Sequence, residues 1–169
     1  MRKSDSFYRH LLHECQSDDR ERRLRALDGL GKDEYLDLVE GQFLLDRLNS
    51  TSDVQEQMAI ERLMCQVKES LPIDALMAIL EDWETSTVFL RMEVAHVLAV
   101  VKAEEALDLF LRLILDPEEH PWLRETLTGD LAIWGERISD ELLLTLLLAK
   151  STVSRPFTEA NMRYISCTK

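Results

Sequence analysis

An apolar stripe with helical spacing recurs along the chain, and it limits the folds that the chain can adopt. Segment 90–101 has an aliphatic residue, then Arg91, then apolar residues three, seven and ten positions after the arginine. Segment 123–134 repeats these offsets around Arg124, which lies 33 positions later. Residues at such offsets share one face of an α-helix. The sequence therefore predicts a helix that is repeated at a fixed period.

Two earlier segments carry weaker copies of the stripe. Gln57 takes the position of the arginine in one copy and is followed by Ile60 and Met64. In the other copy we place Arg20 at that position, with Arg23 replacing an expected apolar residue. The intervals 20 to 57, 57 to 91 and 91 to 124 are then 37, 34 and 33 residues. Periods of this length are typical of stacked helical repeats.

Each stripe follows another amphipathic stretch, so we interpret the repeating unit as a pair of helices that packs on neighbouring pairs. We expect first helices at about 6–16, 33–48, 72–82, 104–115 and 139–150. Second helices are expected at about 19–30, 53–68, 85–102, 121–136 and 155–166. The prediction is a single all-α domain over 1–169, with repeats at approximately 5–31, 33–69, 71–103, 104–136 and 138–167.

Composition supports helices and narrows the class of protein. Five glycines and four prolines are few for a chain of many short strands. The net charge of -12 disfavours nucleic-acid binding, because the phosphates would repel an acidic protein. The sequence has no apolar run near the roughly 20 residues of a membrane helix, and its amino end has no apolar stretch suited to a signal peptide. Three distant cysteines without CxxC spacing indicate free thiols, so we expect a cytoplasmic protein.

Segments 90–101 and 123–135 resemble the second helix of HEAT repeats, particularly the bacterial form, which typically reads V-R-x-x-A-x-x-A-L-G-x-I-G. The resemblance covers most of the chain and is specific in the third and fourth units, whereas the first two units depart from it as described above. It implies a right-handed α-solenoid (α-α superhelix) of about five HEAT-like helical hairpins. In such a fold the first helices form the convex side and the second helices line the concave side.

The resemblance also implies a partner-binding face, because residues outside the stripe of each second helix are free to touch a partner. The positions carried over are Arg22, Arg25, Met58, Arg62, Gln66, Met92, Glu93, His96, Val100, Glu125, Thr126 and Ile133. This set mixes charged and apolar side chains, as protein-binding surfaces commonly do. The alternative for each position is a solvated helical face without a function.

Asp130 stands at a stripe position, where the repeat pattern has an apolar residue and where Val97 lies one repeat earlier. A buried carboxylate needs a partner, so we expect a hydrogen bond or an ion pair, with Arg124 and Arg91 as candidates. The functional alternative is a carboxylate with a raised pKa in a cleft. The two arginines are expected to be structural residues that brace neighbouring repeats through carboxylates or helix ends.

The sequence shows no motif for catalysis, a cofactor or a metal. His10 and His13 lie about one helical turn apart, beside Glu14 and Cys15. We interpret them as a surface pair, because no third metal ligand is indicated. Gly-rich phosphate loops, nucleophile elbows and Ser-His-Asp orderings are absent from the sequence. We therefore assign no catalytic residue, cofactor or metal ligand.

The leading hypothesis is a non-catalytic protein–protein interaction scaffold that uses the concave face and has a protein partner of unknown identity. Residues 1–32 carry a net charge of +2 and residues 33–169 a net charge of -14, so the acidic body favours a basic partner surface. The enzyme alternative is a resemblance of fold to HEAT-like bilin lyases and isomerases, or to alkylpurine DNA glycosylases. A further alternative is a segment of a longer regulatory protein, whose uncapped terminal repeat would favour a homodimer.

Overall fold

Helices account for all the regular secondary structure of the computed structural model, which describes residues 3–134. The elements in this range are α1 (Lys3–Glu14), α2 (Arg20–Leu30), α3 (Asp33–Leu36), α4 (Gly41–Ser50), α5 (Val54–Gln66), η1 (Lys68–Ser70), α6 (Ile73–Glu81), α7 (Val88–Val100), η2 (Glu104–Ala106), α8 (Leu107–Leu115) and α9 (Pro121–Trp134). The all-α prediction is confirmed for this part of the chain. The predicted fifth pair, at 138–167, lies outside the described residues.

Side-chain N-caps begin three of the second helices. Asp19, Asp53 and Thr87 precede α2, α5 and α7, and each side chain accepts a hydrogen bond from a backbone amide two or three residues later. These bonds satisfy amides that have no partner inside the helix. The caps lie at positions 19, 53 and 87, so they recur every 34 residues and define the register of the repeat.

The caps correct the predicted register of the first repeat. When Asp19 is aligned with Asp53, the residue equivalent to Gln57 is Arg23 rather than Arg20. Arg23 also behaves like its counterparts, because its Nη1 donates to the carbonyls of residues 17 and 18 at 2.9 and 3.0 Å, just before the helix begins. Counted over positions 23, 57, 91 and 124, the intervals are 34, 34 and 33 residues.

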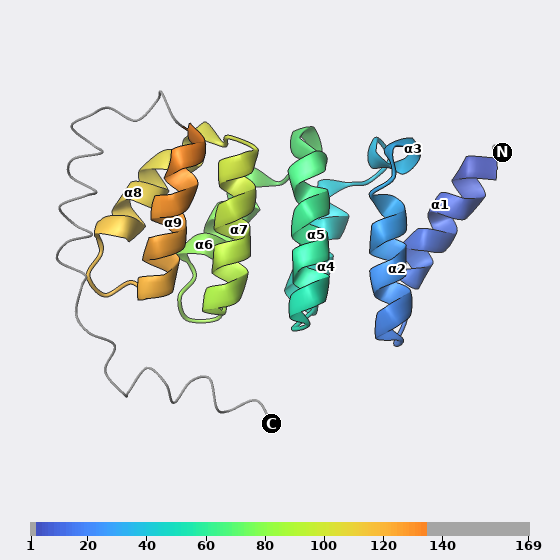
Figure 1. The fold of residues 1–169 in the computed structure, drawn as a ribbon, viewed down its shortest axis with the longest axis horizontal. Helices are drawn as coiled ribbons and strands as arrows, with labels where there is room; N and C mark the ends of the chain where they lie inside the picture. The colour runs from blue at the N-terminus through green and yellow to red at the C-terminus, as the bar shows by residue number, and fades with distance from the viewer. Residues whose placement is uncertain (1–2, 135–169) are drawn as a thin grey trace. The chain divides into compact units, whose positions relative to one another are not determined.

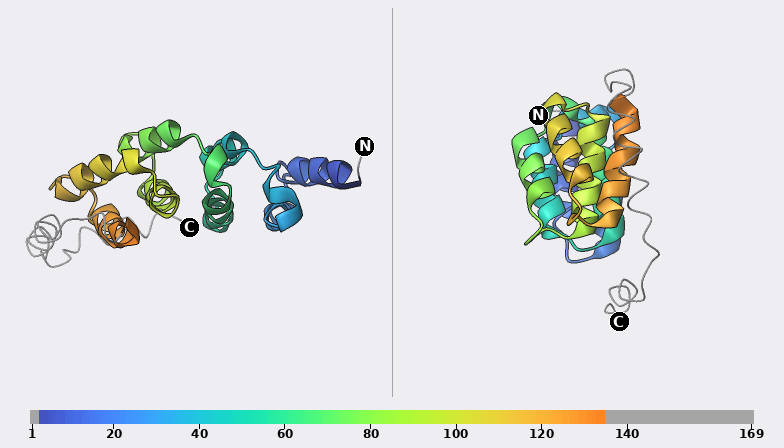
Figure 2. Two further views of the ribbon diagram at one scale, coloured as in Figure 1. Left: turned by 90° about the horizontal axis from the view of Figure 1, so that it is seen from above. Right: turned by 90° about the vertical axis from the view of Figure 1, so that its left-hand side faces the viewer.

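The second helices pack side by side in chain order (Figure 1). Helix α2 contacts α5, α5 contacts α7, and α7 contacts α9. The first helices pack behind them, with α1 on α2, α4 on α5, α6 on α7 and α8 on α9. A view from above shows the two rows as separate layers (Figure 2). Among residues 3–134, no helix covers the outer side of the row of second helices.

The core lies between the two rows and contains the apolar stripes. Leu27, Ile60, Leu98 and Leu127 on the second helices are fully buried, as is Phe110 on a first helix. Burying a leucine or phenylalanine side chain stabilises a fold by roughly 1.5–3 kcal/mol. The stripes that the sequence shows are therefore the surfaces that hold neighbouring pairs together.

The predicted helix 33–48 is wrong in detail, because the structure divides it into α3 and α4. The backbone turns between them, where the amide of Gly41 donates to the hydroxyl of Ser70 at 3.1 Å. Gly41 lies so close to this segment that a Cβ atom there would meet the carbonyl oxygen of Ser70 at 2.3 Å. The interruption of the helix is thus coupled to a long-range contact that helical periodicity does not show.

None of the described helices combines the length and the apolar composition needed to cross a membrane. Cys15 and Cys65 are free thiols, as predicted, whereas Cys167 lies outside the described residues. Burial raises the pKa of Cys15 to about 12 and that of Cys65 to about 11. Both side chains are therefore protonated and unreactive at neutral pH.

Candidate partner-binding face

The structure places every residue of the predicted partner-binding face on the row of second helices. None of them is buried. The exposed members are Arg22, Arg25, Met58, Arg62, Gln66, Glu125 and Ile133, and the half-buried members are Met92, Glu93, His96, Val100 and Thr126. We call the outer side of α2, α5, α7 and α9 the second-helix face.

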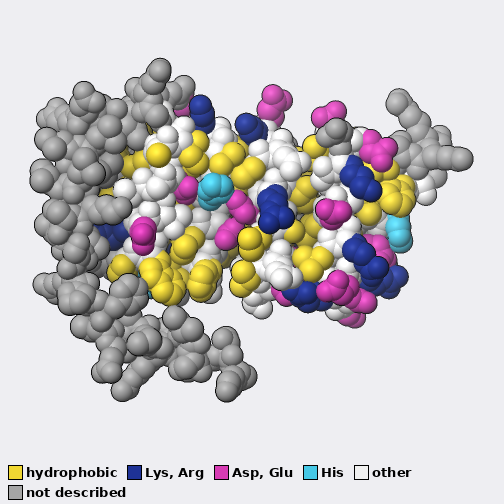
Figure 3. Space-filling view, viewed as in Figure 1, with side chains coloured by type: hydrophobic (Ala, Val, Ile, Leu, Met, Phe, Trp, Pro, Cys, Tyr) yellow, Lys and Arg dark blue, Asp and Glu magenta, His cyan; other side chains and the backbone are white. Residues whose placement is uncertain are grey.

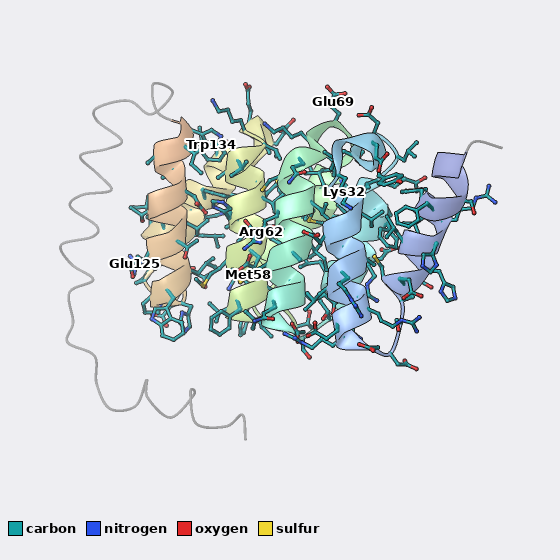
Figure 4. The ribbon with its side chains drawn as sticks, turned by 45° about the vertical axis from the view of Figure 1, so that its right-hand side comes forward. Lys32, Met58, Arg62, Glu69, Glu125 and Trp134 are labelled. Carbon is teal, nitrogen blue, oxygen red and sulfur yellow. The ribbon has the colours of Figure 1, made fainter. Side chains whose placement is uncertain are left out.

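A groove of about 490 Å³ runs between α2 and α5 on this face. Its lining includes Leu24 and Leu27 from α2, and Met58, Arg62 and Gln66 from α5. Figure 4 shows Met58 and Arg62 one above the other on α5. The groove thus brings three of the predicted residues together with apolar side chains of the neighbouring helix.

Acidic side chains and a histidine gather farther along the face, over α5, α7 and α9 (Figure 3). We call this group, which consists of Glu61, Glu93, His96 and Asp130, the acidic cluster. The Nδ1 atom of His96 is hydrogen-bonded to Oδ1 of Asp130 at 2.9 Å, and its Nε2 atom lies 3.5 Å from Oε1 of Glu61. The Glu61 carboxyl group also acts on that of Glu93, whose pKa it raises. The cluster therefore connects three neighbouring second helices.

The cluster shifts the pKa values of its own members. Burial and the neighbouring Glu61 carboxylate raise the pKa of Glu93 to about 7. Burial lowers the pKa of His96, but the hydrogen bond and charge of Asp130, with both glutamates, outweigh this effect and raise it. Burial also raises the pKa of Asp130, against the effect of His96. Near neutral pH, protons are thus retained on this group of carboxylates and imidazole.

Asp130 is buried, with 7% of its surface exposed, but its partner is neither of the expected arginines. The partner is His96, which lies 34 positions earlier on the adjacent second helix. The Oδ2 atom of Asp130 is buried and has no hydrogen-bond partner among the described residues. Sequence reasoning missed Glu61 entirely, although it lies 35 positions before His96. Both partners of His96 lie about one repeat period away in the sequence, and this spacing could have predicted the two contacts.

Arg91 and Arg124 contact the ends of the first helices that precede them. The Nε atom of Arg91 donates to the carbonyl of Leu80 at 2.7 Å, and Nε of Arg124 donates to the carbonyl of Ile114 at 2.8 Å. Arg91 is buried and also pairs with Glu119, through Nη1 and Oε1 at 2.9 Å. These bonds satisfy carbonyls at helix C-termini and leave neither arginine on the second-helix face.

A second ionic network, centred on Glu56, is buried within the fold and was not predicted. Arg23 on α2 and Arg47 on α4 both pair with the Glu56 carboxylate, which also accepts a hydrogen bond from the Thr51 hydroxyl at 3.0 Å. Burial raises the pKa of Glu56, but Arg47 and Arg23 more than offset this effect, so the pKa is lowered. Glu56 is fully buried and therefore serves packing between helices rather than binding.

The paired histidines of α1 remain apart from these clusters. His10 and His13 are exposed, and Nδ1 of His13 lies 3.9 Å from Oε1 of Glu14. Within residues 3–134, no three His, Cys, Asp or Glu side chains are arranged to hold a metal ion.

Comparison of the chain with protein-family models, curated proteins and solved structures gives no match. Its function is therefore inferred from its own residues and their arrangement.

Proposed function

We propose that this protein is a non-catalytic interaction scaffold, built as a right-handed α-solenoid of HEAT-like hairpins, that binds another protein through its second-helix face. The observation that carries this proposal is the row α2, α5, α7 and α9, which presents exposed apolar and charged side chains together on one side. Continuous faces of stacked helical pairs are well suited to binding extended partners. We do not propose that the protein is a bilin lyase or isomerase, or a DNA glycosylase, because no residue among 3–134 favours these enzymes over a binding protein.

Apolar exposure on this face supports binding. Val54 and Met58 on α5 are 54% and 40% exposed, and Phe89 on α7 is 50% exposed. Covering such side chains with a partner would be favourable by about 25 cal/mol for each Å² of apolar surface removed from water. Charged residues between them would contribute specificity more than affinity. Both features agree with a face that binds a partner reversibly.

The groove between α2 and α5 supplies a natural place for an inserted side chain. Its lining includes the apolar Leu24 and Leu27, while Arg62 and Gln66 provide polar groups. Interfaces concentrate their binding energy where a partner side chain fills such a pocket and excludes water. Met58, exposed beside the groove, is thus the position at which a substitution should have the largest effect.

The test is affinity capture from native lysate, with quantitative mass spectrometry, using wild type, Met58→Glu and a matched control. The control is Ala78→Glu, which places the same acidic side chain at an exposed position of α6, in the row of first helices. We expect at least one protein to be retained by wild type and Ala78→Glu and to fall about tenfold with Met58→Glu, because a buried charge costs binding energy. Equal recovery by all three proteins would refute the proposal. Circular dichroism checks that both variants are folded.

A further inference from the structure

Apolar side chains line the N-terminal turns of three second helices. The exposed ones are Val54 and Met58 on α5 and Phe89 on α7, and together with the half-buried Trp122 on α9 we call them the apolar edge. The rings of Phe89 and Trp122 are in contact, with centroids 6.1 Å apart. Hydrophobic side chains gather along this end of α7 and α9 in Figure 3. The edge therefore crosses from one repeat to the next.

The acidic cluster lies next to the apolar edge. Glu93 follows Phe89 by four residues on α7, and Glu61 follows Met58 by three residues on α5. Residues with these spacings are neighbours on the surface of a helix, one turn apart. If a ligand covers the apolar edge, its side chains one helical turn farther along can therefore reach the acidic cluster.

The cluster lacks a permanent positive charge. It contains three carboxyl groups, and none of them forms an ion pair with a Lys or Arg of residues 3–134. Within this range Glu61 and Asp130 pair with His96. Asp130 is buried and bonded to His96 through Oδ1, but its buried Oδ2 atom has no hydrogen-bond partner among residues 3–134. Buried carboxylates without donors are unfavourable, and a cation supplied from outside would relieve that cost.

We propose that the protein's partner places a lysine or arginine side chain in the acidic cluster, while apolar residues of the same segment cover the apolar edge. The partner segment is therefore basic and amphipathic. This inference rests on the proposed function and specifies the chemistry of the partner. A guanidinium group suits the site best, because its fork of donors can bond Glu61 and Glu93 at the same time.

Binding of such a cation should release a proton. The pKa of Glu93 is about 7 in the free protein, owing to burial and the adjacent Glu61. A positive charge beside these two carboxylates favours their ionised forms and lowers the pKa of Glu93. The proton that leaves Glu93 passes to the buffer, so affinity should rise with pH through neutrality.

The other titratable groups around Glu93 set the size of this effect. Glu61 on α5 and His96 on α7 act on it directly, and Cys65 on α5 and Asp130 on α9 complete the group. Helix α6, which packs on another side of α7, contributes none of the charges that act on Glu93. His96 carries a raised pKa and partly neutralises the cluster when protonated, which should weaken cation binding at acid pH.

The test uses the full chain and a fluorescent helical peptide that carries leucines along one side and an arginine beside them. A second peptide has citrulline in place of the arginine, which keeps the shape and removes the charge. We expect the arginine peptide to bind about tenfold more tightly, a factor typical of one charge-assisted hydrogen-bonded pair. Calorimetry near pH 7 in two buffers of different ionisation enthalpy should show proton release with the arginine peptide only.

Glu93→Gln should remove both the preference for arginine and the proton release. Glu69→Gln is the matched control, because it makes the same change of charge at an exposed position in η1, outside the cluster. It should leave the affinity and the proton release unchanged. Phe89→Ser should weaken both peptides, since each has the leucines that cover the apolar edge.

Three results would overturn the inference. The first is equal binding of the arginine and citrulline peptides, and the second is an unchanged arginine preference in Glu93→Gln. The third is competition by free spermine that is as strong in Phe89→Ser as in wild type, which would indicate a site for small cations instead. In each case the capture experiment with Met58→Glu still decides the proposed function, because it measures binding of any protein to the second-helix face and does not depend on a preference for arginine.

Discussion

Glu93 is the residue at which protonation and folding are most closely linked. Its pKa is raised from 4.5 to about 7, so the native state binds more protons than the unfolded state between these values. The stabilising effect of its protonated form is present below its ordinary pKa and is lost as the pH rises through neutrality. The free energy of unfolding should therefore fall over this interval.

Replacing Glu93 with glutamine should remove that fall. Near pH 8 we expect the free energy of unfolding of Glu93→Gln to exceed that of wild type by about 1 kcal/mol, and near pH 4 we expect the two values to match. The expected difference is small because the side chain is half-exposed, so water screens its charge. Thermal unfolding followed by circular dichroism across this range is the measurement. A constant difference between the two proteins at every pH would show that the charge of Glu93 is not responsible.

Two glutamates in ion pairs should differ sharply in their contribution to stability. Glu56 is fully buried between Arg23 and Arg47, whereas Glu81 pairs with Arg112 at the surface, where the side chains are 48% and 65% exposed. Glu56→Gln should cost about 3–5 kcal/mol in free energy of unfolding, because it leaves two largely buried guanidinium groups without their shared counter-charge.

Glu81→Gln is the control, and should cost less than about 1 kcal/mol, because water already solvates that pair. Urea unfolding at neutral pH measures both values. The pKa of Glu56 is lowered, so its contribution is present above the ordinary pKa of glutamate and is lost as the pH falls. Similar costs for the two variants would mean that the buried network is already compensated by water.

The sequence predicted the burial of Asp130 but not its partner, and the reason is geometric. Burial follows from the position of a residue in the stripe, which is a property of one helix. Asp130 bonds to His96 rather than to Arg91 or Arg124 because of how α7 and α9 lie beside each other. Both arginines are already engaged by carbonyls at first-helix ends, which a repeat pattern does not reveal.

At the scale of elements, replacing Gly41 and Gly129 with alanine should change the stability of the fold in opposite directions. A Cβ atom at Gly41 would meet backbone atoms of residues 70 and 71 at 2.3–2.8 Å, whereas one at Gly129 would meet nothing within 4 Å. Gly41→Ala should therefore destabilise the fold by about 1–3 kcal/mol through overpacking at the start of α4. Gly129→Ala should stabilise it by about 0.5–1 kcal/mol, because alanine is the better helix former.

Denaturant midpoints of the two variants check this pair of predictions. If Gly41→Ala is neutral, the approach of α4 to the segment after α5 is looser than the structure shows. If Gly129→Ala is destabilising, a Cβ atom at this position of α9 does not lie in open space.

Helix existence was easier to predict than helix register or continuity. The stripes after Arg91 and Arg124 located α7 and α9 because those repeats keep an apolar residue at each expected offset. The first repeat was shifted by three residues, since Arg20 and Arg23 compete for the same position and only the cap at Asp19 separates them. The interruption near Gly41 could not be predicted, because it depends on Ser70, 29 residues away.

At the scale of the whole molecule, the order of helix contacts indicates that each helical pair is stabilised mainly by the pairs next to it. Helix α2 packs on α1 and α5, and α9 packs on α7 and α8, so the two ends of the described row share no direct contact of that extent. In a linear array of repeats, each unit is stabilised by its own packing and by its nearest neighbours. A defect at one end should therefore loosen that end first.

Leucines at the two ends of the row allow this to be tested in both directions. Leu27 on α2 and Leu127 on α9 are both essentially fully buried, so replacing either with alanine should remove about 2–5 kcal/mol. Hydrogen exchange under native conditions should show Leu27→Ala opening α1, α2 and, to a smaller degree, α5, with α9 unchanged. Leu127→Ala should open α8 and α9 and leave α2 protected. If either substitution instead accelerated exchange equally in all helices, the molecule would be one cooperative globule, and the proposed solenoid would have to be given up.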